Sequence, residues 1–320
     1  MPAIDTDCLV IGAGPAGLSA ALWLRRLGLS CLVLERGDQL GGELQRINLP
    51  IRDFLGCAAS DGRALLGQIE AMVNDRDLPV RFSCAVESLA LDRCEVTTST
   101  GVLRARALIL ALGLRRRVLD LPGEARRLAG GLSYSGTTDR AAIGTGPVAI
   151  VGGGDGAVEN ALILADQCDQ VHLVHRGSHF RAQPQLVERV VAHDRIRLWL
   201  ESEVVELHGA EGKLASVDVA TPKGRRNIVV PWLVIKIGFE PNSDVLRATS
   251  LILDEAGYVV VDRYLRTSVP AVFAAGDLCN PRAPSIAAAV GDGAVAARGV
   301  SQVLWQPGGP LAGDAPTPLG

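Results

Sequence analysis

Two glycine-rich segments have the spacing that binding of a dinucleotide requires. The first, Gly12–Gly17, directly follows the apolar run Cys8–Ile11, and the second, Gly152–Ala157, directly follows Val148–Val151. The glycines permit a tight turn and a close approach of the backbone to a pyrophosphate, which then lies at the N-terminus of the next helix. The context of strand, turn and helix favours two dinucleotide sites over the alternative of two plain turns between packed elements.

The residues that end the next strand of each unit differ in charge. In the first unit this residue is Glu35, whose carboxylate can accept hydrogen bonds from a ribose diol and repels a 2′-phosphate. In the second unit the strand ends in His175 and Arg176, with Arg181 close behind, and cationic groups there suit a 2′-phosphate. The sequence therefore predicts two different dinucleotides, FAD on the first unit and NADPH on the second.

The elements that position these segments indicate an α/β protein. Strands are predicted at 4–11, 30–34, 107–112, 148–151, 171–174, 233–237, 258–262 and 271–275, helices at 15–27, 62–74, 155–167, 183–193 and 285–304, and further strand-like stretches at 80–110 and 196–220. We predict two Rossmann-like dinucleotide-binding domains of the three-layer ββα type. The NAD(P)-binding domain, 114–242, is inserted into an FAD-binding domain formed by 1–113 and 243–320. The two short crossings, with Gly113 and Gly238, are suited to act as a hinge.

Composition excludes several other classes of protein. The chain has 320 residues, of which 48% are hydrophobic and 21% charged, and its net charge of −3 gives no reason to expect nucleic acid or an anionic membrane surface. The N-terminus lacks the features of a secretory signal, and no apolar run approaches the roughly 18 residues of a membrane span. Seven scattered cysteines without a CxxC motif make a disulfide framework or a metal site improbable, and they fit a reducing cytoplasm.

Further motifs resemble the low-molecular-weight thioredoxin reductase family, class II of the pyridine nucleotide-disulfide oxidoreductases. The matching stretches span nearly the whole chain: the first fingerprint with Glu35, Gly41-Gly42, Asn48–Pro50, Leu110–Gly113, Gly152–Glu159, His175-Arg176, Phe180–Ala182, Gly238–Asn242, Arg266-Thr267 and Phe273–Asp277. The resemblance implies a homodimer with FAD on the outer domain and NADPH on the inserted one.

The resemblance also implies which residues contact each cofactor. The FAD set is Gly12, Gly14, Pro15, Ala16, Gly17, Glu35, Arg36, Gly42, Leu44, Asn48, Val86, Ala111, Gly113, Gly276, Asp277, Ser285 and Ile286. The NADPH set is Gly152, Gly154, Asp155, Gly156, Ala157, His175, Arg176, Arg181, Ile237 and Gly238. Asp277 is expected to hold a ribityl hydroxyl, and the helix that starts near Ser285 and Ile286 is expected to direct its N–H groups at the reduced flavin.

The redox disulfide of the family is missing from this sequence. The family has its two cysteines at the positions of Ser135 and Thr138, and a hydroxyl cannot take part in disulfide exchange, which needs a thiolate. We therefore predict neither a conventional thioredoxin reductase nor a dithiol oxidase. Lesser departures are Gly177 in place of a basic residue and Gly156 in place of a hydroxyl residue.

The remaining prediction is an FAD-dependent NADPH oxidoreductase whose flavin reduces an external acceptor directly. The acceptor is a small molecule or a small redox protein, as in ferredoxin/flavodoxin–NADP reductases or diaphorases. The alternatives are a flavin-dependent oxidase or tailoring enzyme acting on a small organic substrate, and a flavin redox sensor without turnover. Tyr134 can stack on the flavin or be an ordinary half-buried tyrosine. Lys236 can touch the phosphate on the nicotinamide side or pack its stem along a strand with its ammonium in water.

Overall fold

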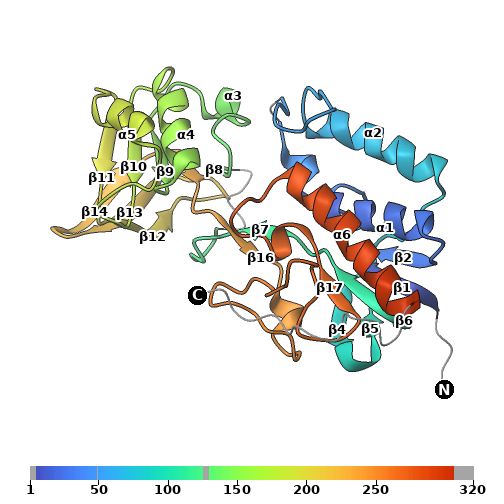
Figure 1. The fold of residues 1–320 in the computed structure, drawn as a ribbon. Helices are drawn as coiled ribbons and strands as arrows, with labels where there is room; N and C mark the ends of the chain where they lie inside the picture. Colours follow the sequence, from blue (N-terminus) through green and yellow to red (C-terminus); the bar gives the residue numbers. More distant parts are fainter. Residues whose placement is uncertain (1–4, 49, 125–129, 306–320) are drawn as a thin grey trace. The chain divides into compact units, whose positions relative to one another are not determined.

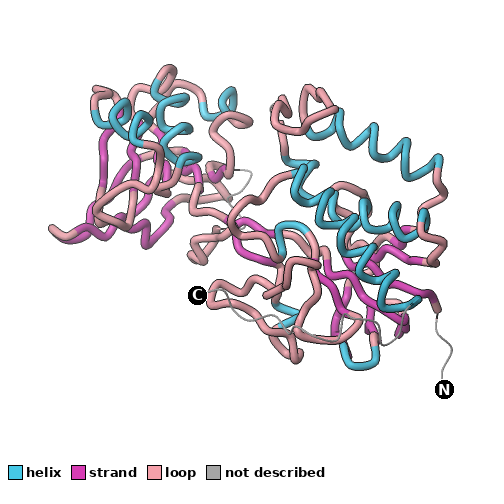
Figure 2. Tube along the Cα trace, viewed as in Figure 1, coloured by secondary structure: helices cyan, strands magenta, loops and turns pink. Residues whose placement is uncertain are grey.

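The computed structural model describes residues 5–48, 50–124 and 130–305. The chain divides into two compact units, one formed by the residues up to Arg115 together with those from Glu240 onward, and the other by Arg116–Phe239 (Figure 1). Each unit is an α/β structure with a parallel sheet at its centre (Figure 2).

The elements of the first unit are β1 (Thr6–Ile11), α1 (Pro15–Arg26), β2 (Cys31–Leu34), η1 (Gly42–Arg46), α2 (Gly62–Asp75), β3 (Val80–Arg81), β4 (Val86–Ala90), η2 (Leu91–Arg93), β5 (Glu95–Thr98), β6 (Gly101–Leu110), β7 (Leu114–Arg116), β16 (Phe239–Pro241), η4 (Asp244–Leu246), β17 (Val272–Ala274), η5 (Gly276–Leu278) and α6 (Ile286–Trp305). Strands β7 and β16 run through the two crossings between the units and pair with each other.

The sheet of the first unit has the order β3-β2-β1-β6-β5-β4, with β17 also paired to β6. Strand β6 serves two sheets at once: its first half pairs antiparallel with β5, and its second half pairs parallel with β1 and β17. The buried strand expected at 107–112 is present as the second half of β6, which begins earlier, at Gly101, and ends at Leu110. No glycine or proline interrupts 102–110, so the chain continues without a turn from the exposed ribbon into the buried core.

Helices α1 and α6 cover one face of this sheet and cross each other closely. Small residues make the approach possible: a Cβ on Gly293 would lie 2.2 Å from the carbonyl oxygen of Ala16. Ser19 Oγ also donates to the carbonyl oxygen of Val290, at 2.6 Å. The helix that follows the first glycine turn is thus fixed by the C-terminal part of the unit (Figure 1).

The elements of the second unit are β8 (Leu132–Ser133), α3 (Arg140–Ile143), β9 (Val148–Val151), α4 (Asp155–Ala165), β10 (Val171–Val174), α5 (Pro184–Val191), β11 (Ile196–Trp199), β12 (Glu203–His208), β13 (Ser216–Thr221), β14 (Gly224–Val229) and β15 (Trp232–Ile235). Its parallel sheet has the order β11-β10-β9-β15-β8. Helices α4 and α5 pack on one face, and the antiparallel sheet β12-β13-β14 packs on the other, which gives the three-layer ββα arrangement predicted from the sequence.

The strand expected at 258–262 is absent from the described residues. The structure has only an isolated antiparallel bridge there, between Leu253 and Val259. The alternating pattern arises because Val259 is buried in the core, while Tyr258 and Val260 on either side of it are only partly buried. Burial of alternate side chains in a loop therefore imitates the pattern of a strand.

Candidate nucleotide and redox sites

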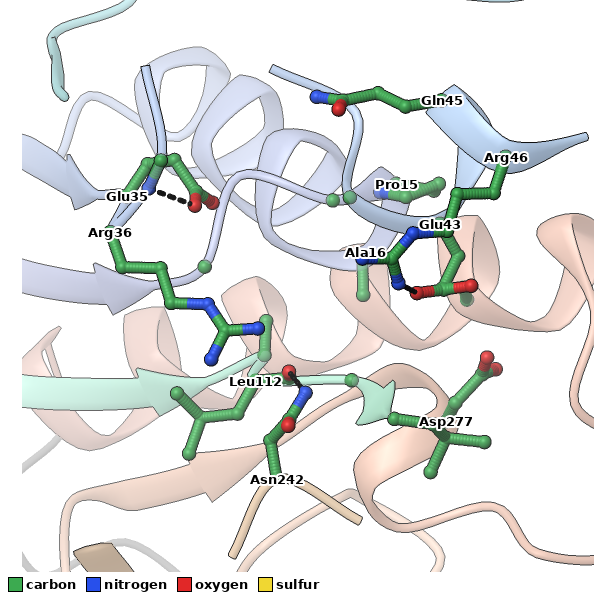
Figure 3. A pocket seen from close by; sticks show the side chains of 18 of the residues that line it. Pro15, Ala16, Glu35, Arg36, Glu43, Gln45, Arg46, Leu112, Asn242 and Asp277 are labelled. Atoms are coloured by element: carbon green, nitrogen blue, oxygen red, sulfur yellow. Dashed lines mark hydrogen bonds and ion pairs between the residues drawn. The ribbon is translucent and has the colours of Figure 1, made fainter. Parts of the chain in front are cut away.

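A cleft of about 280 Å³ lies at the C-terminal ends of the central strands of the first unit (Figure 3). Ten residues of the predicted FAD set line it: Gly12, Gly14, Pro15, Ala16, Glu35, Arg36, Gly42, Ala111, Gly113 and Asp277. These residues come from segments that are far apart in the sequence. Parallel strands end at one edge of the sheet, and this edge is where open α/β folds bind their ligands.

The glycines of the first fingerprint are required by close backbone contacts. A Cβ on Gly12 would lie 2.3 Å from the carbonyl oxygen of Ala111, and one on Gly17 would lie 1.9 Å from that of Gly12. By contrast, no atom lies within 4 Å of a Cβ on Gly14, which faces the cleft. The turn is therefore packed tightly on the inside and open on the side where a pyrophosphate would approach the N-terminus of α1.

Glu35 connects two loops of the cleft through its carboxylate. The Ala13 N–H donates to Oε2 at 2.9 Å. The Gly37 N–H donates to Oε1 at 2.8 Å (Figure 3). The carboxylate therefore fixes the glycine turn against the loop that follows β2. Each carboxylate oxygen can accept a further hydrogen bond, so that the same side chain can also bind a ribose diol.

Asn242 is a cleft residue outside the predicted FAD set. Its Nδ2 donates to the carbonyl oxygen of Leu112 at 2.8 Å, and its N–H donates to that of Gly113 at 3.0 Å. Its Oδ1 is buried and has no hydrogen-bond partner among the described residues. An unsatisfied buried acceptor beside an open cleft is suited to accept a donor from a bound molecule. Asn242 belongs to the family motif Gly238–Asn242, but the motif alone did not indicate that this residue lies in the cleft.

The floor of the cleft near α6 is acidic. Burial raises the pKa of Asp277, and the charges of Asp292 and Glu43 add to the shift. Burial likewise raises the pKa of Asp292, whose Oδ2 accepts from the Gly276 N–H at 3.2 Å. Glu43 itself forms an ion pair with Arg46 across the cleft wall (Figure 3). These acidic groups would repel a bound anion at this end of the cleft. They suit the polar, uncharged hydroxyls of a sugar alcohol chain, which can donate hydrogen bonds to them.

Seven residues of the predicted FAD set do not line the cleft: Gly17, Leu44, Asn48, Val86, Gly276, Ser285 and Ile286. Leu44 is buried in a small core cluster, against which Ile286 packs, and Val86 packs in the core on the other face of the sheet. Ser285 precedes α6, and its Oγ accepts from the Ala288 N–H at 3.2 Å, so that it caps the helix. These residues support the cleft or flank it, and a role in cofactor binding remains a prediction for them.

The second fingerprint is packed like the first: its turn is in close backbone contact on one side and open on the other. A Cβ on Gly152 would lie 2.2 Å from the carbonyl oxygen of Lys236, whereas a Cβ on Gly154 would meet nothing within 4 Å. Asp155 Oδ1 accepts from the Gln183 N–H at 2.7 Å, and this bond fixes the start of α4 to the start of α5. The N-terminus of α4 is thus open above Gly154, as a pyrophosphate requires.

The basic residues near this turn are divided between core and surface. The His175 ring is buried: it packs against Gly153, stacks on Phe180 at 5.3 Å, and lies 2.9 Å by its Nε2 from the carbonyl oxygen of His179. Arg176 and Arg181 are exposed, and the Arg181 N–H donates to the carbonyl oxygen of Gly153 at 2.7 Å. The two guanidinium groups are therefore available for a 2′-phosphate, while His175 shapes the turn.

Ser135 and Thr138 lie in one turn of the second unit, between β8 and α3. Thr138 Oγ1 donates to Ser135 Oγ at 3.0 Å, and the Thr138 N–H donates to the same oxygen at 3.3 Å. The Gly136 N–H donates to Asn160 Oδ1 at 2.8 Å, which anchors the turn to α4. The two hydroxyls are hence adjacent, as a pair of thiols would be, but they carry no redox chemistry.

Tyr134 and Lys236 flank this turn. The Arg116 guanidinium lies over the Tyr134 ring at 5.3 Å, and burial raises the pKa of the Tyr134 hydroxyl. Lys236 is half-buried, and its Nζ donates to the carbonyl oxygen of Tyr134 at 3.4 Å. The alternative in which the Lys236 ammonium lies in water was therefore incomplete, because the ammonium turns back into the unit.

One group of side chains in the described residues has ligands close enough for a metal ion: Glu206, His208 and Asp218 on β12 and β13. The Arg225 guanidinium binds both carboxylates, with Nε 2.6 Å from Asp218 Oδ2. Its positive charge offsets part of the negative charge of the two acids, so this group is an ion-pair network on the surface of the sheet.

Two glycine-lined nucleotide sites on two ββα units define a flavoprotein that exchanges electrons with a pyridine nucleotide. The chain belongs to the pyridine nucleotide-disulphide oxidoreductase family, whose model matches residues 6–293. It is 31% identical to a thioredoxin reductase of Listeria innocua over 303 residues, which cover 93% of each chain. The crystal structure of Lactococcus lactis thioredoxin reductase, in its FR conformation, is similar with a TM-score of 0.79 and 29% identity, covering 94% of this chain and 99% of the other. For the T. acidophilum thioredoxin reductase the TM-score is 0.77 and the identity 26%, with 94% and 99% covered.

The chain is therefore an NAD(P)H-dependent flavin oxidoreductase with FAD and NADPH as cofactors, as predicted from the two fingerprints. Within the described residues, none of the helices combines the length and apolar character needed to cross a bilayer.

Proposed function

We propose that this enzyme passes electrons from FAD directly to an external acceptor, without a redox disulfide. The observation that carries the proposal is the hydroxyl pair of Ser135 and Thr138, 3.0 Å apart in the turn before the second fingerprint. When bound, FAD supplies the hydride and electron chemistry, and the protein supplies position and charge. The turn keeps a compact hydrogen-bonded shape, although neither side chain can accept electrons.

The seven cysteines of the chain do not replace the missing dithiol. All seven fall within the described residues and are free thiols. Burial raises the pKa of Cys31 and Cys94 to about 11 and that of Cys279 to about 12, and it also raises the pKa of Cys8 and Cys168. A raised pKa suppresses the thiolate, which is the form that attacks a disulfide. Burial and free thiols also suit the reducing cytoplasm in which we place the protein.

The residues of the two sites would divide the work. In the first unit, the Gly12–Gly17 turn and Glu35 would hold the adenosine and pyrophosphate of FAD, and Asp277 would accept a hydrogen bond from the ribityl chain. In the second unit, the Gly152–Ala157 turn would hold the NADPH pyrophosphate, and exposed Arg176 would bind the 2′-phosphate. Gly113 and Gly238, both with positive φ, would be the hinge positions that let the two units change their relative orientation.

An anaerobic titration with dithionite tests the proposal. The wild type is expected to take up two electrons per FAD, whereas an enzyme with flavin and disulfide takes up four. The matched control is the double variant Ser135→Cys with Thr138→Cys, in which the adjacent positions should form a disulfide and raise the uptake to four electrons. Four electrons in the wild type would overturn the proposal.

The acceptor follows from a second assay. Steady-state NADPH oxidation is measured with ferredoxin, with flavodoxin, with O₂ alone and with thioredoxin plus a chromogenic disulfide. We expect turnover with a small redox protein or a small molecule, and none above the buffer blank with thioredoxin. We further propose a homodimer, which light scattering after gel filtration would detect as twice the mass of one chain.

A further inference from the structure

Lys236 occupies the space that a side chain at position 156 would take. A Cβ on Gly156 would lie 3.1 Å from Lys236 Cε and 3.7 Å from its Nζ. Lys236 directly follows β15, the neighbour of β9 in the sheet, and Gly156 is the second residue of α4. The lysine therefore reaches from the end of one strand across the first turn of the fingerprint helix.

This location is unfavourable for a cation as long as no anion is bound. The N-terminus of a helix carries the positive end of its dipole and N–H groups without a partner in the helix, and α4 is eleven residues long. The half-buried ammonium also lies near the Arg116 guanidinium. Burial and Arg116 both lower the pKa of Lys236, and only Glu159, one turn further along α4, opposes them. Cationic groups thus converge where the helix itself is positive.

The bond that holds the ammonium is weak. Lys236 Nζ has three N–H donors, and among the described residues its hydrogen bond is the one to the carbonyl oxygen of Tyr134, at 3.4 Å. The adjoining turn is open above Gly154, where no atom would contact a Cβ. An ammonium with donors to spare, beside an open helix N-terminus, is arranged to bind an oxyanion.

We propose that Lys236 is a positioning residue that binds the pyrophosphate of NADPH at the start of α4, in place of a side chain at position 156. The glycine at 156 leaves the room, and the lysine supplies a charged donor from a different strand. The proposal rests on the nucleotide site of the second unit and not on the disulfide-free electron route. Each can therefore fail without the other.

Direct binding of NADP⁺ to the purified FAD-loaded protein, measured by calorimetry, tests this role. Lys236→Met keeps the length of the stem and removes the charge, so the Kd for NADP⁺ should rise about tenfold or more, as expected for the loss of a charge-assisted hydrogen bond. The control ligand is 2′-AMP, which has the adenosine and the 2′-phosphate but no 5′-phosphate. Its Kd should stay the same, and its binding also reports that the site is folded.

A second pair of variants tests whether the ammonium stands in for a side chain at 156. In the Lys236→Met background, Gly156→Ser places a hydroxyl donor on the first turn of α4 and should recover part of the NADP⁺ affinity. Gly156→Ala in the same background fills the space without a donor and should recover nothing.

Three results would overturn the proposal. An unchanged Kd for NADP⁺ in Lys236→Met would remove the phosphate contact. An equal loss for NADP⁺ and 2′-AMP would mean that Lys236 only supports the turn at Tyr134. Equal affinities of the Ser and Ala variants would show that position 156 and Lys236 do not share one role.

Discussion

Replacement of Glu35 by glutamine is the most direct test of the FAD site, because this carboxylate makes two defined bonds. It accepts from the Ala13 N–H at 2.9 Å and from the Gly37 N–H at 2.8 Å. A glutamine side chain has the same shape but only one acceptor oxygen, and its NH₂ group would face the other N–H. One charge-assisted bond is therefore lost whichever way the amide is oriented.

The expected magnitude follows from that count. A hydrogen bond to a charged group contributes about 1.5–3 kcal/mol, which corresponds to about a 10- to 150-fold change in an equilibrium constant. The lost bond fixes the two loops that line the FAD cleft. We therefore expect the Kd for FAD to rise in Glu35→Gln by a factor in this range.

The assay is reconstitution of the apoprotein with FAD, followed by the quenching of flavin fluorescence. Glu70→Gln is the matched control, because Glu70 is an exposed acid on α2 that is not part of the cleft lining. An FAD affinity of Glu35→Gln equal to that of the wild type would refute the reasoning. So would the recovery of FMN as the bound flavin, since FMN has no adenosine for Glu35 to hold.

Three further predictions concern the nucleotide preference, a buried acid and a helix contact. Replacing Arg176 and Arg181 together by alanine should raise the KM for NADPH far more than that for NADH, and equal effects in initial-rate assays would contradict a 2′-phosphate site at these exposed cations. Burial raises the pKa of the Asp292 carboxyl, so the free energy of unfolding falls as the pH rises from the ordinary pKa of 3.8 through the raised one. Asp292→Asn should therefore raise the Tm at neutral pH but not below pH 3.8. A gain in Tm that is independent of pH in scanning calorimetry would contradict this prediction. Gly293→Ala would place a methyl group 2.2 Å from the backbone of α1 and should lower stability by about 1–3 kcal/mol in urea unfolding, whereas Gly291→Ala on the same helix meets nothing within 4 Å and should be neutral or stabilising.

Sequence patterns predicted the parts of the fold that depend on local chemistry. Both glycine turns with their strands and helices are where the spacing placed them, because close backbone contacts at Gly12 and Gly152 admit no other residue. The prediction at 258–262 failed, since burial in a loop also alternates. The sequence also did not show that a single strand, β6, joins two sheets. No residue marks the point at which its pairing changes from β5 to β1.

The sequence predicted those site residues whose place depends only on the strand that they follow. Glu35 is the first residue after its strand and Arg176 the second after its own, so their position in the sequence indicates their place at the edge of the sheet. Asn242 lies more than a hundred residues from Leu112, to which it is bonded, and Lys236 lies eighty residues from Gly156. Such pairs become visible only when distant segments are brought together.

The close crossing of α1 and α6 has a consequence for the order of events during synthesis. Residues of α1 leave the ribosome early, but the strand β17 and the helix α6 that complete their unit follow only after the whole of Arg116–Phe239 has been made. The second unit is continuous in the chain and can fold as soon as it emerges. The first unit must wait with an exposed apolar helix until its last element arrives. The nascent chain therefore acquires its pyridine-nucleotide site before its flavin site, and release of a truncated product lacking α6 would yield a folded second unit attached to an aggregation-prone first one.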